Sequence, residues 1–496
     1  MERADLAVAR PFRFRVSPLR SRQVVGTGLV AVLLAAVLSR AAGAPEWLNS
    51  WLVASAALAF AGLLMVARRL TVATTDDAER YVFAARLALV VGLLGVLYQS
   101  RNPGFGLGVD RGLDAAMVFL ALTALCVLAG DPRQYDPFQW VALGCFAVVA
   151  GIFFYHGVPV AEGSVRSRHP IWWGVLAGTC LVVLPAYVSR DAYLWALSRL
   201  SAILIALALP VYAVGEFSLY GLQVGFHGAY TIPLAEYEVR ATRSLFVNRN
   251  GFALVVFAGF VASIAELYRS FDTKRRLPGL TIAVSVVLVA VNTLGMAIAY
   301  GRALWVITPM ALGVYAAYLA FGRRALPIAV VAGIAYLATG IAAVHSGVLK
   351  LPDGTPTRMN RWYPAIEAVT DQPSLLGEGL IAPGEFIADY HPTGSSGSPH
   401  NSYLSIWIRT GIVGGMAYVG LVVASLLRGV VRYREVDIGV LALAVGFAAH
   451  QLFDVYTMFQ TGASSVVAAL AIGMVLFGDR PLERTGDAGP STIPDR

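Results

Sequence analysis

Long apolar stretches recur along the whole chain, and they limit the folds that it can adopt. Each runs for roughly 17 to 23 residues, enough for a helix to cross a hydrocarbon core about 30 Å thick. Hydrophobic residues make up 57% of the chain and charged residues only 14%, far from the composition of a soluble protein. The sequence predicts an all-α integral membrane protein with about 14 transmembrane helices, in a range of about 12–14. The predicted spans are 23–39, 47–66, 81–98, 113–129, 137–156, 171–188, 193–214, 251–268, 280–299, 303–320, 325–345, 402–427, 436–454 and 460–477.

These spans divide the chain into five parts. They are a basic cytoplasmic leader (1–22), a transmembrane bundle (23–345) with an extracytoplasmic loop at about 215–250, a large extracytoplasmic loop (346–401), C-terminal transmembrane helices (402–477) and a polar cytoplasmic tail (478–496). The first span also fits a signal peptide, because Arg-rich sequence precedes it and small residues follow it at 41–44. Its removal would leave the later orientation unchanged.

The basic residues predict the orientation of the chain. About 23 of the 38 Lys and Arg fall on the same side as the leader, and about 12 on the other side. Since cytoplasmic loops carry the excess of positive charge, both termini are expected in the cytoplasm and the protein in the cytoplasmic (inner) membrane. The net charge of +8 then reflects a leader beside an anionic leaflet. No nucleic-acid-binding motif accompanies it, so we expect no nucleic acid as a partner.

Six arginines on the predicted outer side break this bias. Arg240 and Arg243 lie in "EVRATRSLFVNRN" with Arg249 close behind, Arg302 opens a span in "AYGRALWVI", and Arg358 and Arg361 lie in "TRMNRWYPAIEAV". Each alone fits an interfacial anchor that reaches lipid headgroups. Together they favour a lipid-linked diphosphate, because guanidinium groups bind phosphate through two parallel hydrogen bonds.

The second arginine segment has the pattern of a short surface helix. Trp362, Ile366 and Val369 fall at helical spacing, which predicts a helix whose apolar face lies on the outer surface. Arg358 and Arg361 would project from its start.

A lone histidine lies where the large loop meets the next span, in "SSGSPHNSYLSIWIRTGIVGG". Asn401 or Ser402 would make an ordinary N-cap, so His400 is not needed for capping. Histidine has an unperturbed pKa of about 6.5 and can take a proton from a hydroxyl. An ordinary interfacial histidine is the alternative, and Asn401 is a candidate for orienting the imidazole or a substrate.

Other chemistry finds less support in the sequence. Three acids of the large loop are alternative bases, although solvated loop acids would look the same: Glu378, Glu385 and Asp389. No HxxxH, HExxH or DxD pair lies near His400, so no metal site and no cofactor are predicted. The three cysteines, Cys126, Cys145 and Cys180, lie in apolar runs without a CxxC pair.

From about residue 240 to 425 the chain resembles the O-antigen ligase and O-antigen polymerase superfamily of polytopic membrane glycosyltransferases. The His-Asn-x-x-Leu helix start and its Gly-x-x-Gly turn correspond to His400, Asn401, Leu404, Gly411 and Gly414. The Arg-Trp helix and the Gly-x-Gly stretch correspond to Arg361, Trp362, Gly377, Gly379, Gly384 and Phe386. The Phe-x-Asn-x-Asn turn corresponds to Phe246, Asn248 and Asn250, with Arg243 before it. Around Arg302 the chain departs from Ser-Arg-Gly, with Gly301 and Ala303 as neighbours.

The resemblance implies a metal-independent transferase whose donor is a glycan on an isoprenoid (undecaprenyl-type) diphosphate, acting in cell-surface polysaccharide synthesis. It implies that Arg302, Arg361 and Arg243 bind the diphosphate and that His400 activates the acceptor hydroxyl in an inverting displacement. Arg240, Arg358 and Asn401 are further candidate substrate contacts. In this superfamily the acceptor hydroxyl belongs to a glycan, a lipid or a protein, so polymerase, ligase and protein glycosylation stay open, as does the oligomeric state.

A transporter or flippase of lipid-linked saccharides is the alternative function. Transport would place polar residues near the midplane and leave broken helices. Most ionisable residues instead gather at the predicted outer face; Arg86, Arg199 and Arg409 are the exceptions.

Overall fold

The structure, a computed structural model, describes residues 89, 92–97, 116–124, 135–157, 165–219, 222–232, 237–271, 278–346, 356–379, 381–390 and 397–478. The predicted leader, the first two predicted spans, Arg86, Cys126 and most of the predicted tail lie outside these residues. The predicted spans 81–98 and 113–129 are described only in part, where they are helical. The total of about 14 spans therefore stays a prediction.

Ten predicted spans coincide with helices in the described part of the chain. The helices are α5 (Pro137–Gly157), α6 (Val165–Gly178), which runs through a π-helical turn (Thr179–Val183) into α7 (Leu184–Tyr187), α8 (Arg190–Ala208), α9 (Val211–Val214), α10 (Arg249–Ser270), α11 (Pro278–Ala299), α12 (Leu304–Phe321), α13 (Leu326–His345, after a 3-10 turn at Arg323–Ala325), α16 (Ser402–Val431), α17 (Ile438–His450) and α18 (Ala463–Leu476). Seven of the described helices are long and apolar enough to cross a membrane, and three apolar helices are shorter. The chain is a multi-pass membrane protein.

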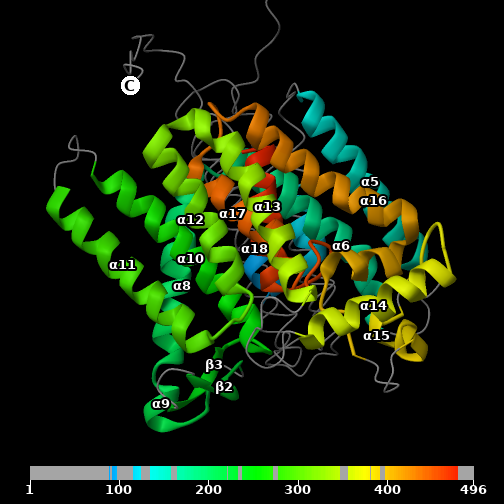
Figure 1. The fold of residues 1–496 in the computed structure, drawn as a ribbon, viewed down its shortest axis with the longest axis horizontal. Coiled ribbons are helices and arrows are strands. Elements are labelled where there is room, and N and C mark those ends of the chain that lie inside the picture. The colour runs from blue at the N-terminus through cyan, green and yellow to red at the C-terminus, as the bar shows by residue number, and fades with distance from the viewer. Residues whose placement is uncertain are drawn as a thin grey trace, which may run out of the picture.

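Helix α10 lies at the centre of the bundle, with α17 and α18 beside it and α5, α11, α13 and α16 around them (Figure 1). Its side chains are buried on nearly every face. The crossing with α8 is close at Gly259, where an added Cβ would lie 2.2 Å from Ser201 Cβ. Small residues at such crossings let helix backbones approach in a membrane, where the hydrophobic effect does not drive packing.

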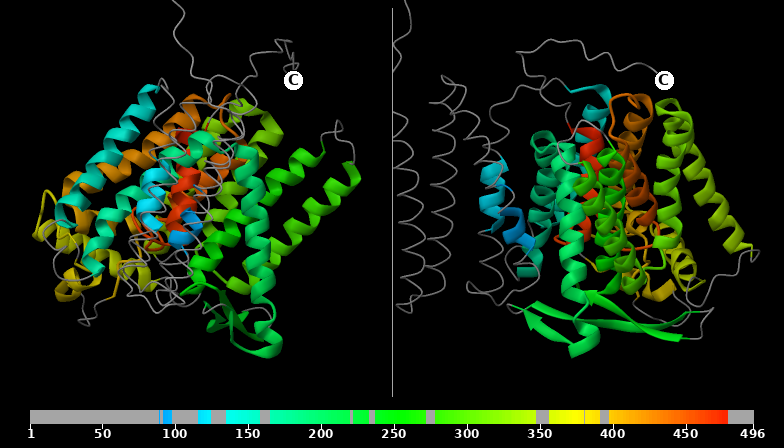
Figure 2. Two further views of the ribbon diagram at one scale, coloured as in Figure 1. Left: turned by 180° about the vertical axis from the view of Figure 1, so that it is seen from behind. Right: turned by 90° about the vertical axis from the view of Figure 1, so that its left-hand side faces the viewer.

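A three-stranded antiparallel sheet occupies the first predicted outer loop, which the prediction of an all-α chain did not include. It contains β1 (Phe217–Leu219), β2 (Leu222–Ile232) and β3 (Tyr237–Ser244), in the order β1-β2-β3. It covers one end of the bundle (Figure 2), which we call the hairpin end. Ser244 anchors it there, because its Oγ donates to the carbonyl of Leu204 in α8 at 2.9 Å.

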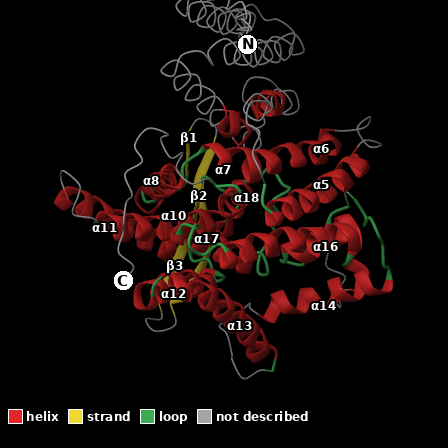
Figure 3. Cartoon of the chain, turned by 90° about the horizontal axis from the view of Figure 1, so that it is seen from above, coloured by secondary structure: helices red, strands yellow, loops and turns green. Residues whose placement is uncertain are grey.

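Short helices of the second predicted outer loop also lie at the hairpin end, as predicted. They are α14 (Pro356–Asp371), α15 (Pro383–Phe386) and a 3-10 turn (Ala388–Tyr390), and α14 lies alongside α16 (Figure 3). The predicted apolar face of α14 was only partly right. Ala365 and Ala368 are fully buried against Ile387 and Ile408, whereas Ile366 is 47% exposed.

Arginines from the predicted cytoplasmic loops gather at the opposite end of the bundle. Arg269 lies 2.6 Å from Asp191 and also pairs with Asp437, and Arg428 Nε donates to Asp136 at 2.7 Å. These contacts join segments that are far apart in the sequence, so they tie the helix ends together.

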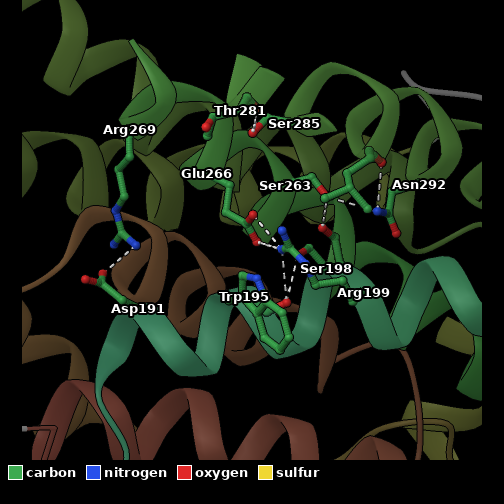
Figure 4. A network of polar contacts seen from close by, with 12 residues as sticks. Asp191, Trp195, Ser198, Arg199, Ser263, Glu266, Arg269, Thr281, Ser285 and Asn292 are labelled. Carbon is green, nitrogen blue, oxygen red and sulfur yellow. Dashed lines mark hydrogen bonds and ion pairs between the residues drawn. The ribbon is translucent and has the colours of Figure 1, made fainter. Parts of the chain in front are cut away.

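One ion pair lies inside the apolar helices (Figure 4). Arg199 of α8 and Glu266 of α10 approach to 2.5 Å, and the Ser198 hydroxyl donates to the same carboxylate. Near them, Asn292 of α11 donates to Ser263 at 2.9 Å. Ionisable residues among apolar helices are costly and are normally paired in this way.

Candidate functional site

His400 lies in the turn that leads into α16. Asn401 is the N-cap, since its Oδ1 accepts a hydrogen bond from Leu404 N at 3.1 Å, and this confirms the predicted cap. The backbone of His400 has φ 47°, a left-handed conformation that costs a non-glycine residue about 1 kcal/mol or more. Such strain is typical of functional positions.

A partly buried carboxylate faces the imidazole. Asp454 Oδ1 lies 3.9 Å from His400 Nδ1, and the side chains are 15% and 34% exposed. Nδ1 itself is buried and has no hydrogen-bond partner among the residues that the structure describes. The separation exceeds a hydrogen bond by roughly 1 Å. A small closure would therefore give a His–Asp pair that fixes the tautomer and leaves Nε2 available as a base.

Ser402 fixes Asp454 relative to the histidine. Its Oγ donates to the carbonyl of Asp454 at 2.7 Å, and its backbone N–H donates to the carbonyl of Gln451 at 2.7 Å. The start of α16 is thus bound to the connection between α17 and α18. Sequence reasoning did not single out Asp454. Its signal was a single acid in "HQLFDVY" between two apolar runs.

Arg361 of α14 lies beside the same turn. Its Nη1 donates to the carbonyl of Ser398 at 3.4 Å, and a Cβ at Gly397 would lie 3.0 Å from its Cζ. The next residue, Trp362, has its ring centroid 6.0 Å from that of Phe453, close to Asp454 in the chain. We call His400, Arg361 and Asp454 the histidine cluster.

The remaining predicted arginines lie elsewhere at the hairpin end. Arg243 of β3 donates to Gln223 Oε1 at 3.3 Å, and its Nε is buried with no hydrogen-bond partner in the described part of the chain. Arg240 is exposed, with its guanidinium 4.3 Å from the Phe226 ring centroid. In the described part of the chain, neither shares a hydrogen bond with the histidine cluster.

Arg302 follows a close contact between the turn from α11 to α12 and the start of α10. An added Cβ at Gly301 would lie 2.6 Å from Ala253 Cβ. Arg358 lies in the first turn of α14. The structure therefore brings His400 and Arg361 together. Arg302 instead lies beside α10, the helix that follows the arginine-bearing strand β3.

Helix α16 is broken at Gly411, which has φ 67° and ψ −167°. The loop 374–379 supplies backbone partners for the groups that this break leaves unpaired. The bonds are Ile412 N to Ser374 O (3.0 Å), Val413 N to Leu375 O (3.2 Å), Glu378 N to Ile408 O (2.8 Å) and Gly379 N to Arg409 O (2.9 Å). An added Cβ at Gly377 would lie 2.3 Å from Gly411 N, so two glycines of the sequence motifs meet backbone to backbone.

Helix α5 also holds this loop. His156 Nε2 lies 2.8 Å from the carbonyl of Leu376, in a hydrogen bond that the ring nitrogen donates. Among the described residues, no three His, Cys, Asp or Glu side chains are grouped so that they could hold a metal ion. The chemistry available at this end is therefore a histidine with a carboxylate, and several guanidinium groups.

A comparison with protein families tests the predicted resemblance at the hairpin end. The O-antigen ligase family model matches residues 287–419, from the middle of α11 to just past the break in α16. This match, over about a quarter of the chain, supports membership of the O-antigen ligase family. The matched segment includes Arg302, Arg358, Arg361, His400 and Asn401, whereas Arg240, Arg243 and Asp454 lie outside it. No curated protein sequence matches the chain.

Proposed function

We propose that this protein is a membrane glycosyltransferase that transfers or polymerises a glycan from an isoprenoid (undecaprenyl-type) diphosphate onto an acceptor hydroxyl. The observation that carries the proposal is the histidine cluster. His400 faces a partly buried carboxylate at 3.9 Å and Arg361 binds the same turn, at one end of an apolar bundle. The family match over His400 and Arg361 supports it.

In this proposal His400 is the general base. Its Nε2 takes the proton of the acceptor hydroxyl as the oxygen attacks the anomeric carbon. Asp454 accepts a hydrogen bond from Nδ1–H and stabilises the imidazolium that forms. The bonds of Ser402 keep Asp454 near His400, so that a small closure is enough to form this hydrogen bond.

The arginines receive the leaving group. As the new carbon–oxygen bond forms, the bond between the anomeric carbon and the phosphate oxygen breaks, and the diphosphate keeps the electron pair. Arg302 and Arg243 hold this diphosphate and stabilise its charge, so the displacement needs no metal ion. Arg361 contributes charge and also positions the His400 turn, because it donates to Ser398. Attack from the opposite face inverts the anomeric configuration.

The hairpin end is proposed to face away from the cytoplasm. The ion-paired arginines Arg269 and Arg428 lie at the opposite end of the bundle. The positive-inside bias favours the cytoplasm for that end. Donor and acceptor would then meet at the outer surface of the cytoplasmic membrane, where cell-surface polysaccharide is assembled.

Purified protein in nanodiscs, supplied with a glycan on an isoprenoid diphosphate and an acceptor glycan, tests the proposal. His400→Ala should lower kcat by about 100-fold or more, the usual contribution of a general base. Arg432→Gln at the opposite end is the control and should leave turnover unchanged, since Arg432 is exposed and pairs with Glu435. Turnover of His400→Ala within about threefold of wild type would refute the assignment.

A glycan size profile of the source cells distinguishes the acceptor classes. In cells with His400→Ala, single capped repeats on the cell surface would indicate a polymerase. Accumulated long lipid-linked chains would indicate a ligase.

Two observations favour transport as the second candidate. Arg199 and Glu266 form an ion pair within the apolar helices, and α16 is broken at Gly411. Arg409 lies at this break, with its guanidinium 5.4 Å from the Trp173 ring centroid. Proteoliposomes that move a fluorescent lipid-linked saccharide between leaflets, with wild-type rates for His400→Ala, would support transport.

A further inference from the structure

Arg249 stands at the junction between the sheet and the helix bundle. It is the first residue of α10, after Asn248, whose Oδ1 caps the helix by accepting from Gly251 N at 2.9 Å. In the Phe-x-Asn-x-Asn turn it occupies the unspecified position between the two asparagines. The resemblance therefore assigns it no role, and the O-antigen ligase match begins only at residue 287.

The guanidinium of Arg249 lies between strand β2, which pairs with the arginine-bearing strand β3, and the turn that precedes Arg302. On one side, an added Cβ at Gly228 of β2 would lie 4.0 Å from its Nη1. On the other, its Cζ is 5.9 Å from the ring centroid of Tyr300, two residues before Arg302. Tyr300 has φ 45°, so the turn that presents Arg302 has a fixed, unusual conformation.

Arg243 of β3 shares the neighbourhood of Arg249. Both guanidinium groups lie close enough to His227 of β2 to act on it electrostatically. Burial lowers the pKa of this imidazole, and the charges of Arg249 and Arg243 lower it further. Arg243 also has its Nε buried without a hydrogen-bond partner. Cations gathered in this way repel one another, and a bound anion relieves the repulsion.

We propose that Arg249 is a donor-binding residue that contacts the diphosphate between Arg243 and Arg302. This proposal rests on the proposed function. A diphosphate offers several anionic oxygens on two phosphorus atoms, and planar guanidinium groups on both sides match it better than a single arginine. The sheet then has a function in this protein, because β2 and β3 form one wall of the donor site.

Donor kinetics of Arg249→Gln and Arg249→Lys in nanodiscs test the proposal, with inorganic pyrophosphate as a competitor. Arg249→Gln should raise the donor KM and the pyrophosphate Ki about tenfold or more, while kcat stays within about threefold, because the contact is made equally in the bound donor and in the transition state. Arg249→Lys should recover part of the loss, since it keeps the charge but not the two parallel hydrogen bonds. Arg432→Gln is the matched control for loss of one positive charge.

The outcomes separate this inference from the proposed function. A wild-type KM and Ki in Arg249→Gln, together with loss of kcat in His400→Ala, would overturn the role of Arg249 alone. Wild-type turnover in both variants would overturn the proposed function. If Arg249→Gln lowers the melting temperature, Arg249→Lys decides: an unchanged Ki in that variant overturns the inference.

The lipid composition identifies the source of the phosphate. The change in pyrophosphate Ki should be the same in nanodiscs of phosphatidylcholine and in nanodiscs containing phosphatidylglycerol. A change seen only with the anionic lipid would mean that Arg249 binds a lipid headgroup, and this would overturn its role in binding the donor.

Discussion

Replacing Gly411 with alanine tests whether the loop 374–379 completes the broken helix α16. At φ 67° and ψ −167° a residue other than glycine is strained by about 1–3 kcal/mol. An added Cβ would also lie 2.4 Å from the carbonyl carbon and oxygen of Leu375. These are backbone atoms that cannot rotate away, so the loop must separate from the helix.

The cost follows from the hydrogen bonds at this contact. The two bonds nearest the clash are Ile412 N to Ser374 O and Val413 N to Leu375 O, at 3.0 and 3.2 Å. At about 1 kcal/mol each, their loss adds about 2 kcal/mol to the strain. We expect Gly411→Ala to be destabilised by about 3–5 kcal/mol. At about 2 °C per kcal/mol for a large domain, the melting temperature should fall by roughly 6 °C or more.

Thermal unfolding of the purified protein in detergent measures this loss. Gly313→Ala in α12 is the control, because nothing lies within 4 Å of an added Cβ there. Alanine in a helix interior should leave its melting temperature unchanged or slightly higher. Gly377→Ala should resemble Gly411→Ala. The double variant should lose less than the two losses combined, because both disrupt one contact. A wild-type melting temperature in Gly411→Ala would refute this account of the contact.

Three further predictions concern charged groups. Asp454→Asn should lower kcat about tenfold or more and leave the donor KM within about threefold of wild type, because Asp454 acts through His400 and not on the donor. Equal changes in kcat and in the donor KM would contradict this role. Glu266→Gln should destabilise the protein by about 2–4 kcal/mol in thermal unfolding, because it leaves Arg199, which is only 28% exposed, without its ion-pair partner. The double variant Arg199→Met with Glu266→Leu should recover most of this loss. Burial raises the pKa of Asp136, but hydrogen bonds from Arg428 and from the backbone outweigh burial and hold this pKa below 3.8. The ionised carboxylate therefore stabilises the fold above about pH 4, and this stabilisation is lost as the pH falls through the lowered pKa. The melting temperature of Asp136→Asn should therefore fall less steeply in acid than that of the wild type; identical profiles would contradict this.

Local patterns in the sequence predict the helices well. The apolar spans from 137 onward became helices, and the cap at Asn401 was predicted because its signal lies within four residues. The sheet was missed although "YEVRATRS" alternates between apolar and polar residues. That run is short and lies between long helical patterns, and its pairing with β2 depends on bonds that no local pattern shows.

The candidate site was predicted in part for the same reason. His400 and Arg361 belong to recognisable motifs, and the structure brings them to one turn. Asp454 was missed because only the bonds of Ser402 bring the connection after α17 to the start of α16. The sequence shows the glycine motifs but not their structural role, because that role is the tertiary contact between Gly377 and Gly411.

The contact between loop 374–379 and α16 bears on how relatives of this protein can be recombined. Loops between membrane helices are usually treated as exchangeable modules. Here the loop provides four backbone hydrogen bonds to a helix that is incomplete without it. A chimera that exchanges this loop would have to carry residues 402–413 of α16 with it, because the backbone groups of both segments complete each other's hydrogen bonds.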